Sequence, residues 1–337
     1  MIISVRKAVL HILDANSGIT VYSNTELDTS EGMINAFITG HIDKVMEDGS
    51  LRKGEFKESS GFKQRLEEYI ENKDIVAFSQ FIAHRVYDGI SNASETESCD
   101  IMVCDCIAND NPIIAVLKFD NKIGYTHQVH QDGDEIRNNL INHYAILPMP
   151  TQKVAECAFI YTNDFSVKYK GKKRVIDGEK MDLFADIVLE GIFDLSAREA
   201  ISKVKRIAKN VTESNGGDSI EINAKMKQYI VENIEENDFE FVETQKIAET
   251  VFDGRPVMKQ EFIEKLDKEE VPQKVEVTHQ VTKRLSSNVK IITDTGIEIS
   301  FPAEFYKDNE NIEIINNEDG KISIKINNVG EIINKSR

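Results

Sequence analysis

The sequence predicts an α+β protein. We expect an N-terminal domain with an antiparallel sheet and flanking helices, then an acidic helical region and a small C-terminal part rich in β-hairpins. Three observations predict this class. Helical and strand-like periodicities occupy separate parts of the first half, strand-like segments follow one another from residue 100 to 162, and two hairpin signals lie near the C-terminus. The 337 residues are enough for about two domains.

The first elements are a hairpin and three helices. ISVRKAVLHILD, residues 3–14, is typical of a strand, Gly18 supplies a turn, and ITVY forms a second strand. Residues 34–46 then repeat apolar side chains three or four apart, which predicts a helix. The same period over residues 61–90, broken at ENKD, predicts two helices with Asp74 as the N-cap of the second.

A sheet is expected next. Segments rich in β-branched and aromatic residues alternate with turn residues such as Asn109–Pro112 and Asp132–Gly133. We predict an antiparallel meander of five strands, with SVKYKGKKRV (166–175) continuing it as a last strand. The five segments are residues 100–108, 111–120, 122–130, 141–149 and 154–162.

Helices resume after the sheet. Residues 180–193 are predicted to be helical, and residues 195–211 form a further helix that Ser196 caps. TESNGGDS has two glycines among polar neighbours and is the best linker in the chain. We therefore predict an N-terminal domain over residues 1–211, a linker over 212–217 and a C-terminal domain over 218–337.

The C-terminal domain begins with acidic helices, over residues 226–241, 242–252 and 259–271. Two hairpins follow, with turns at Asp294–Gly296 and Asn317–Gly320, since Asp-Gly is a strong hairpin signal. Carboxylate-rich helices are most often solvated faces. A docking surface for a basic protein partner is the alternative.

Charge suggests what the protein binds. The chain has 58 acidic and 41 basic residues, a net charge of −17, which argues against indiscriminate binding of nucleic acid. A local basic face is still compatible with that total. The candidate phosphate-binding residues form two clusters: Lys168, Lys170, Lys172, Lys173 and Arg174, then Lys203, Lys205, Arg206 and Lys209.

These clusters have two interpretations. Cations that neutralise DNA phosphates release counterions and give salt-dependent affinity, and a preponderance of lysine suits backbone contact better than base readout. Lysines in a turn also block unwanted edge pairing of strands without any binding role. Two clusters flanking one predicted helix favour the phosphate-binding interpretation.

No enzyme motif is present. The sequence has no phosphate-binding glycine loop, no G-x-S-x-G elbow and no H-E-x-x-H zinc helix. A divergent metal-dependent nuclease built on Asp105, Lys118 and Asp120 is an alternative. Its weakness is Val116, which stands where the usual Glu-x-Lys pattern has an acid. We therefore predict a protein that is not an enzyme.

No metal or cofactor site is predicted either. Cys99, Cys104, Cys106 and Cys157 are expected to be reduced, buried thiols in a cytoplasmic chain. Cys104 and Cys106 lack the partners of a zinc site, and His127 and His130 fall on opposite faces of one strand. The sequence has no long apolar run and no signal peptide at its start, so we expect a cytoplasmic location and no membrane partner.

The order of elements resembles the bacterial nucleoid-associated protein family of NdpA type, over roughly residues 1–326. The similarity lies in VRKAVLHILD (5–14), DIVAFSQFIAHRVYDGI (74–90), DIMVCDCIANDNPIIAVLKFDNKIGYTH (100–127) and VKIITDTGIEISFPAEFY (289–306). The resemblance implies a cytoplasmic protein of the bacterial nucleoid that binds DNA with low sequence selectivity and without catalysis. It assigns no site residues.

Our leading hypothesis is therefore a nucleoid-associated protein that contacts DNA phosphates through the two basic clusters. The alternatives are an adaptor whose acidic helices hold a basic protein partner, and the divergent nuclease. A homodimer is compatible with each, because symmetric dimers are the commonest oligomers.

Overall fold

The chain folds into two units, Met1–Asp194 and Leu195–Arg337. The computed structural model describes residues 1–217, 219–236, 241–277, 289–302, 311–317, 322–331 and 333. The division falls earlier than the boundary predicted at 211–218. The reason is helix α4 (Ala197–Ser214), whose apolar face packs in the core of the second unit, and Thr212, the first residue of the predicted linker, is buried in that helix.

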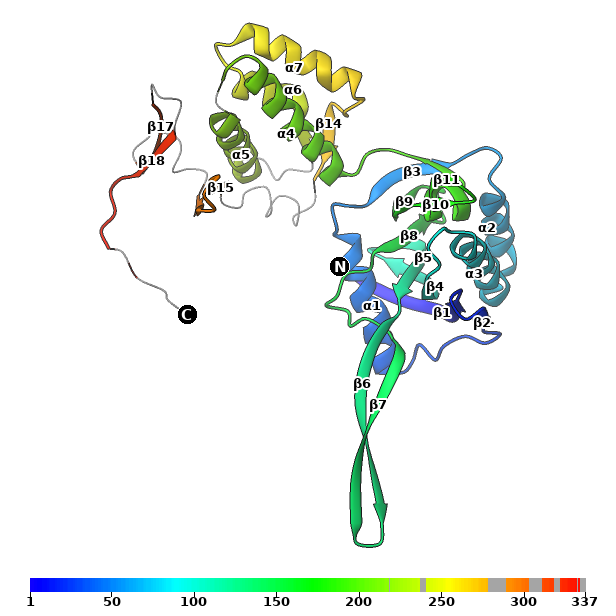
Figure 1. Ribbon diagram of the computed structural model, residues 1–337. Coiled ribbons are helices and arrows are strands. Elements are labelled where there is room, and N and C mark those ends of the chain that lie inside the picture. Colours follow the sequence, from blue (N-terminus) through cyan, green and yellow to red (C-terminus); the bar gives the residue numbers. More distant parts are fainter. Residues whose placement is uncertain are drawn as a thin grey trace. The chain divides into compact units, whose positions relative to one another are not determined.

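The first unit is built on an eight-stranded sheet in the order β12-β3-β9-β8-β5-β4-β1-β2 (Figure 1). Every registered neighbour pair in this sheet is antiparallel. The strands are β1 (Ile3–Asp14), β2 (Ile19–Val21), β3 (Arg52–Phe56), β4 (Ser98–Ala108), β5 (Asn111–Asp120), β8 (Glu156–Tyr161), β9 (Val167–Lys170) and β12 (Gly191–Phe193).

Helices cover both faces of this sheet. Helix α1 (Gly32–Met46) packs on one face through Ile38, Ile42 and Val45. Helices α2 (Gly61–Asn72) and α3 (Ile75–Ser91) pack on the other face. Because both faces are covered, the central strands are buried almost continuously, and this confirms the predicted α+β class with flanking helices.

Local signals in the sequence fix several of these elements. Asp74 caps α3, as predicted, because its side chain accepts a hydrogen bond from the Ala77 amide at 3.0 Å. The predicted strand at residues 3–14 is β1, and it forms the expected hairpin with β2. All four cysteines are buried free thiols, also as predicted.

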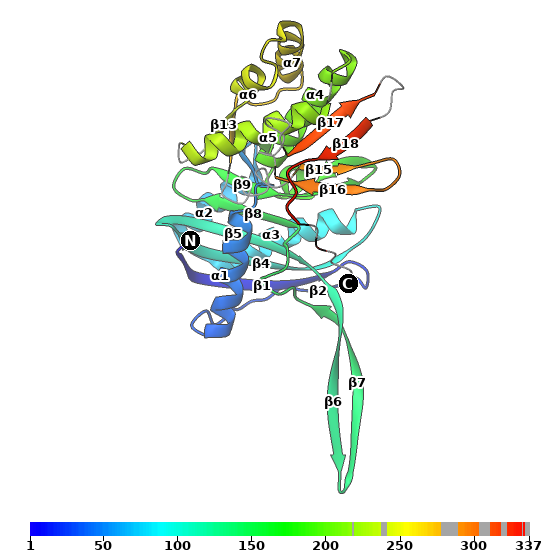
Figure 2. The ribbon, with the colours of Figure 1, turned by 90° about the vertical axis from the view of Figure 1, so that its left-hand side faces the viewer.

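The predicted five-strand meander is wrong in its middle. β6 (Lys122–Asp132) and β7 (Glu135–Ile146) leave the sheet as a separate two-stranded ribbon, and β5 pairs directly with β8. Figure 2 shows this ribbon extending away from the rest of the first unit. Strand periodicity predicts that a segment is extended, but it does not determine which strand becomes its partner.

The predicted strand 166–175 and helix 180–193 are also corrected. The strand divides into β9 and β10 (Lys173–Ile176), and β10 pairs with β11 (Glu179–Asp182). Gly171 lies between β9 and β10, where an added Cβ would lie 2.3 Å from a carboxylate oxygen of Asp182. The predicted helix is reduced to one π-helical turn, η1 (Leu183–Val188), which Asp182 caps and which Glu190 follows in a left-handed conformation with φ 51°.

The second unit combines four helices with short hairpins in the part of the chain that is described. Its main core joins α4 to α5, α6 and α7, and a smaller cluster packs the hairpin strands on Ala224 of α5. Its elements besides α4 are α5 (Ser219–Glu236), β13 (Phe241–Glu243), α6 (Thr244–Val251), α7 (Pro256–Lys268), β14 (Lys274–Glu276), β15 (Val289–Ile292), β16 (Glu298–Phe301), β17 (Ile312–Asn316) and β18 (Ile322–Ile326).

The predicted C-terminal hairpins are present. β15 pairs with β16 and β17 with β18, and Gly296 has the positive φ, 85°, that the first turn requires. The second predicted turn, at residues 317–320, lies largely outside the described residues.

Candidate nucleic-acid interface

Two cations of the first basic cluster are part of the fold. Lys170 donates to Asp48 at 2.9 Å, with the side chains 17% and 13% exposed. Arg174 binds Glu156, which is fully buried, at 2.5 Å and also contacts Glu97. Removing one partner of a buried ion pair leaves an uncompensated charge, so these two cations are poor candidates for exchange onto a phosphate.

The two carboxylates that bind Arg174 belong to a network around Lys118. Its ammonium, which is inaccessible to solvent, lies 2.9 Å from Glu97, 2.6 Å from Asp120 and 3.0 Å from Glu156. Burial alone would lower the pKa of Lys118, but the neighbouring negative charges, Glu156 first among them, outweigh it and raise that pKa. Ligand oxygens of the three carboxylates lie within 4.8 Å of one another, a spacing that suits a metal ion, but Lys118, Arg174 and Lys172 already pair with them.

The residues of the nuclease alternative do not form one site. Asp105 lies opposite Ile114 on β5, whereas Lys118 lies opposite Ile101 on β4. Four strand positions therefore separate Asp105 from Lys118, about 13 Å along the sheet. Asp105 is instead bound by Arg6 and by the Tyr69 hydroxyl, which donates to it at 2.5 Å.

The other three cations of the first cluster are more accessible. Lys173 is exposed on β10, and Lys172 is 56% exposed with Asp120 at 3.6 Å. Lys168 is half-buried, with its ammonium 5.5 Å from the centre of the Tyr161 ring. It lies opposite Lys53 on β3, and two like charges directly opposite on a sheet repel each other. Lys168, Lys172 and Lys173 are therefore the cations of the first cluster that DNA can reach.

The second cluster lies on α4, in the second unit, so the two clusters belong to different units. Ser196 and Glu199 form a capping box at the start of α4. The helix buries Ile201, Val204 and Ala208 in the core of its unit. The basic residues of α4 lie beside this apolar face, as predicted from their spacing.

Three of these α4 cations line a pocket of about 490 Å³ between α4, the first turns of α5 and β15. We call it the α4–α5 pocket. Among the described residues that line it there are four cations and no carboxylate. Its lining comprises Lys205, Arg206, Ala208, Lys209, Ser219, Ile220, Ile222, Asn223, Met226, Lys290, Ile291 and Ile292.

The start of α5 adds to the positive potential of the pocket. Ser219 and Asn223 of its first turns line the pocket, and α5 extends over 18 residues. The amide groups at a helix N-terminus carry a partial positive charge that stabilises nearby anions. The first turn of α5 also holds a carboxylate, Glu221, but Lys225 and Arg255 pair with it and it does not line the pocket. The pocket therefore gathers ammonium and guanidinium groups, which is the chemistry that binds phosphate.

Lys205 is the most constrained of these cations. Burial lowers the pKa of its ammonium, and the neighbouring charge of Lys227 lowers it further. Burial also lowers the pKa of Lys227, which is 8% exposed. Two desolvated ammonium groups near each other raise the free energy of the folded protein, and an anion in the pocket would reverse that effect.

The other pocket cations have exposed partners. Arg206 pairs with Glu269, Lys209 lies 3.7 Å from Glu213, and Lys290 lies 2.7 Å from Glu298. Their cationic side chains are between 54% and 61% exposed. Exposed pairs of this kind contribute about 0–1 kcal/mol, so a phosphate can compete for these cations. Lys203 donates to the Glu269 carbonyl at 3.0 Å and is not among the lining residues.

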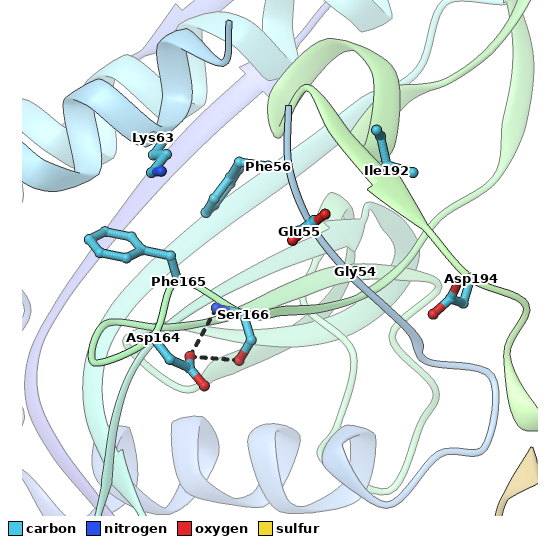
Figure 3. A pocket seen from close by; sticks show the side chains of 9 residues that line it. All are labelled: Gly54, Glu55, Phe56, Lys63, Asp164, Phe165, Ser166, Ile192 and Asp194. Carbon is cyan, nitrogen blue, oxygen red and sulfur yellow. Dashed lines mark hydrogen bonds between the residues drawn. The ribbon is translucent and has the colours of Figure 1, made fainter. Parts of the chain in front are cut away.

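A second pocket, of about 450 Å³, lies in the first unit and has the opposite charge. Figure 3 shows Phe56 and Phe165 beside Lys63, with Glu55, Asp164 and Asp194 around the same hollow. Three carboxylates against one ammonium disfavour a phosphate there.

Sequence reasoning identified the α4 residues but missed Lys290 and Lys227. Lys290 is more than 80 residues away in the chain, and only the packing of the hairpins on α5 brings β15 to the pocket. Lys227 stands in a helix that was interpreted as acidic. No local pattern marks either residue as a partner of α4.

The described helices include none with the length and apolar character needed to cross a bilayer. No curated protein matches the chain. One family model does match, over residues 9–334, and it is described as nucleoid-associated protein YejK. This match covers nearly the whole chain and confirms the family resemblance seen in the sequence. The chain belongs to the family of nucleoid-associated protein YejK.

Proposed function

We propose that the protein binds DNA without sequence selectivity and that the α4–α5 pocket is its main phosphate contact. The observation that carries the proposal is the lining of this pocket, which holds Lys205, Arg206, Lys209 and Lys290 and no carboxylate among the described residues. Membership of a nucleoid-associated family supports a role at the chromosome.

The net charge of −17 limits how such binding works. Most of the surface repels a polyanion, so the attraction has to come from cations gathered at one place. A phosphate at Lys209 or Arg206 replaces a weak, exposed ion pair, and it releases counterions from the DNA. The free energy gained from the phosphate contacts and from counterion release therefore exceeds the free energy lost with the internal ion pairs.

The first cluster has a secondary role in this proposal. Lys168, Lys172 and Lys173 would add contacts to the DNA backbone, whereas Lys170 and Arg174 remain paired with their carboxylates. The same hypothesis places the protein in the cytoplasm, at the nucleoid, and includes no catalytic step and no cofactor.

Charge reversal at Lys209 tests the proposal. Lys209→Glu is expected to weaken binding to a duplex of mixed sequence about tenfold, because a charge-assisted contact of about 1.5 kcal/mol becomes a repulsion. The measurement is fluorescence anisotropy of labelled DNA at fixed salt, with a second duplex of different sequence to show that selectivity is low.

Lys246→Glu is the matched control. Lys246 is also a helical lysine of the second unit, 58% exposed against 61% for Lys209, and it also has a carboxylate partner close by in the sequence, Glu243, the N-cap of α6. It does not line the α4–α5 pocket. If Lys209→Glu and Lys246→Glu bind DNA with equal affinity, the α4–α5 pocket is not the DNA contact. Reversal at Lys173 is expected to weaken binding less than reversal at Lys209.

A further inference from the structure

The β6–β7 ribbon presents an apolar face that no other described element of the first unit covers. Register places Tyr125 opposite Asn142, Leu140 opposite His127, Val129 opposite Asn138 and Ile136 opposite Gln131. Since side chains alternate between the two faces of a strand, these four rows share one face. Each row holds one apolar side chain and one uncharged polar side chain.

The apolar side chains of this face are unusually accessible. Tyr125 is 66% exposed, Val129 57%, Ile136 65% and Leu140 74%. A two-stranded ribbon is only marginally stable in water unless a hydrophobic face packs against something. Figure 1 shows no other element of the first unit beside the distal part of the ribbon. Contiguous exposed apolar surface of this kind marks an interaction site.

Charge identifies the partner. Residues 123–131 and 138–152 contain no Asp, Glu, Lys or Arg, although 29% of the chain is charged. With Arg137 as the only cation between Ile123 and Gln152, the ribbon lacks what a DNA backbone requires. Its carboxylates, Asp132, Asp134 and Glu135, are confined to the tip, so two copies with a net charge of −17 each can approach along the uncharged stretches with little local repulsion.

We propose that the apolar face of the β6–β7 ribbon packs against the same face of a second copy of the chain, in a two-fold symmetric dimer. A two-fold axis makes the same patch serve both copies, so the apolar side chains of one ribbon meet those of the other. The Asn, Gln and His side chains beside them supply hydrogen bonds across the contact without burying a charge.

The size of the ribbon sets the strength of this dimer. Strands of 11 and 12 residues form a face about 37 Å long and about 10 Å wide, or about 370 Å² per copy in projection. A standard stable interface buries about 800 Å² per partner. The ribbon contact alone therefore gives a weak, reversible dimer.

Salt distinguishes this contact from DNA binding. Added salt screens the repulsion between two copies of charge −17 and leaves apolar contacts intact, so dimerisation strengthens as salt rises. Binding of DNA weakens under the same change. The dimer and the proposed DNA contact therefore respond to salt in opposite directions.

The test is sedimentation velocity of the full chain without DNA, at several protein concentrations and at low and high salt. The wild-type chain is expected to dimerise more at high salt. Val129→Glu is expected to remain monomeric, because it places a charge on the apolar face. Gln128→Glu is the control, since it places the same charge on the opposite face of the same strand, and it is expected to dimerise like the wild type.

A cross-linking experiment keeps the test decisive if Val129→Glu does not fold. The four native cysteines are buried, so a cysteine introduced on the ribbon is the only thiol that a cross-linker can reach in the folded protein. Leu140→Cys is expected to form a covalent dimer with a short bismaleimide, and Asn139→Cys, on the other face, to form much less. Equal cross-linking of the two, a wild-type chain that stays monomeric at every concentration, or a Val129→Glu variant that dimerises normally would each overturn the proposal. If Val129→Glu dimerises normally but no longer binds DNA or lipid vesicles, the proposal is also overturned. The apolar face would then bind DNA or a membrane instead of a second copy.

Discussion

Lys118 and Lys205 show how the surroundings decide what a cation withdrawn from solvent does. Lys118 lies among Glu97, Asp120 and Glu156, and their negative charges hold it in the ionised form. Lys205 lies near Lys227 at a pocket whose described lining has no carboxylate. The first lysine is thus paired within the sheet and is not available to an outside anion. The second remains available to an anion from outside.

This contrast predicts the effect of Lys205→Met on stability. The folded state lowers the pKa of Lys205 below its usual value of 10.5, so the unfolded chain binds the proton more tightly. The protonated amine therefore destabilises the fold at neutral pH, and stability rises as pH increases through the interval between the lowered pKa and 10.5. We expect a higher Tm at pH 7 for Lys205→Met together with weaker DNA binding.

Differential scanning fluorimetry across pH measures this effect. Lys209→Met, at a 61% exposed position, is the control and is expected to change the Tm little. A lower Tm for Lys205→Met would show that the ammonium stabilises the fold, contrary to the account.

At the scale of elements, helix α4 links the core of the second unit to its basic pocket. One face packs Ile201, Val204 and Ala208 into that core, and the neighbouring face carries the pocket cations. The capping box of Ser196 and Glu199 fixes where the helix begins. A change in the first turn of α4 therefore affects both stability and the position of Lys205.

The N-cap of α4, Ser196, predicts how a single substitution changes stability. Ser196→Ala is expected to lower the free energy of unfolding by about 1 kcal/mol, because the Glu199 amide loses its side-chain acceptor. Urea denaturation followed by circular dichroism measures the change. Ser202→Ala, an exposed position within the same helix, is expected to be neutral or slightly stabilising. A Ser196→Ala variant as stable as Ser202→Ala would show that the cap does not matter.

Elements with strong local signals were predictable from the sequence, and their partners were not. The cap at Asp74 and the spacing of apolar residues placed α3, and Ser196 placed α4. The β6–β7 ribbon was predicted as strands of the sheet, because local alternation does not reveal that these strands leave it. Residues 180–193 have helix-like apolar spacing, yet Asp182 and the left-handed Glu190 confine the helix to one turn.

In the candidate site, too, the features set by local sequence were predictable and those set by tertiary packing were not. Lys205, Arg206 and Lys209 are adjacent in sequence, so their clustering was predictable, as was their separation from the apolar face of α4. The contributions of Lys290 and the start of α5 depend on tertiary packing. The pairing of Lys170 and Arg174 with buried carboxylates likewise depends on residues far away in the chain.

At the scale of the whole molecule, we propose that a chain of net charge −17 binds a polyanion through a small set of cations. Such binding has a measurable signature. For duplex DNA, each phosphate contact contributes about 0.9 to the slope of log affinity against log salt. The slope therefore counts the contacts independently of the absolute affinity.

The most direct test is this slope for the wild-type chain, for the double variant Lys205→Met with Lys209→Met, and for the control Lys246→Met. We expect the slope of the double variant to be shallower by about 2, because two phosphate contacts are lost. The control is expected to match the wild type. If the double variant and the wild type have the same slope, DNA does not bind at the α4–α5 pocket, and the account is contradicted at its centre.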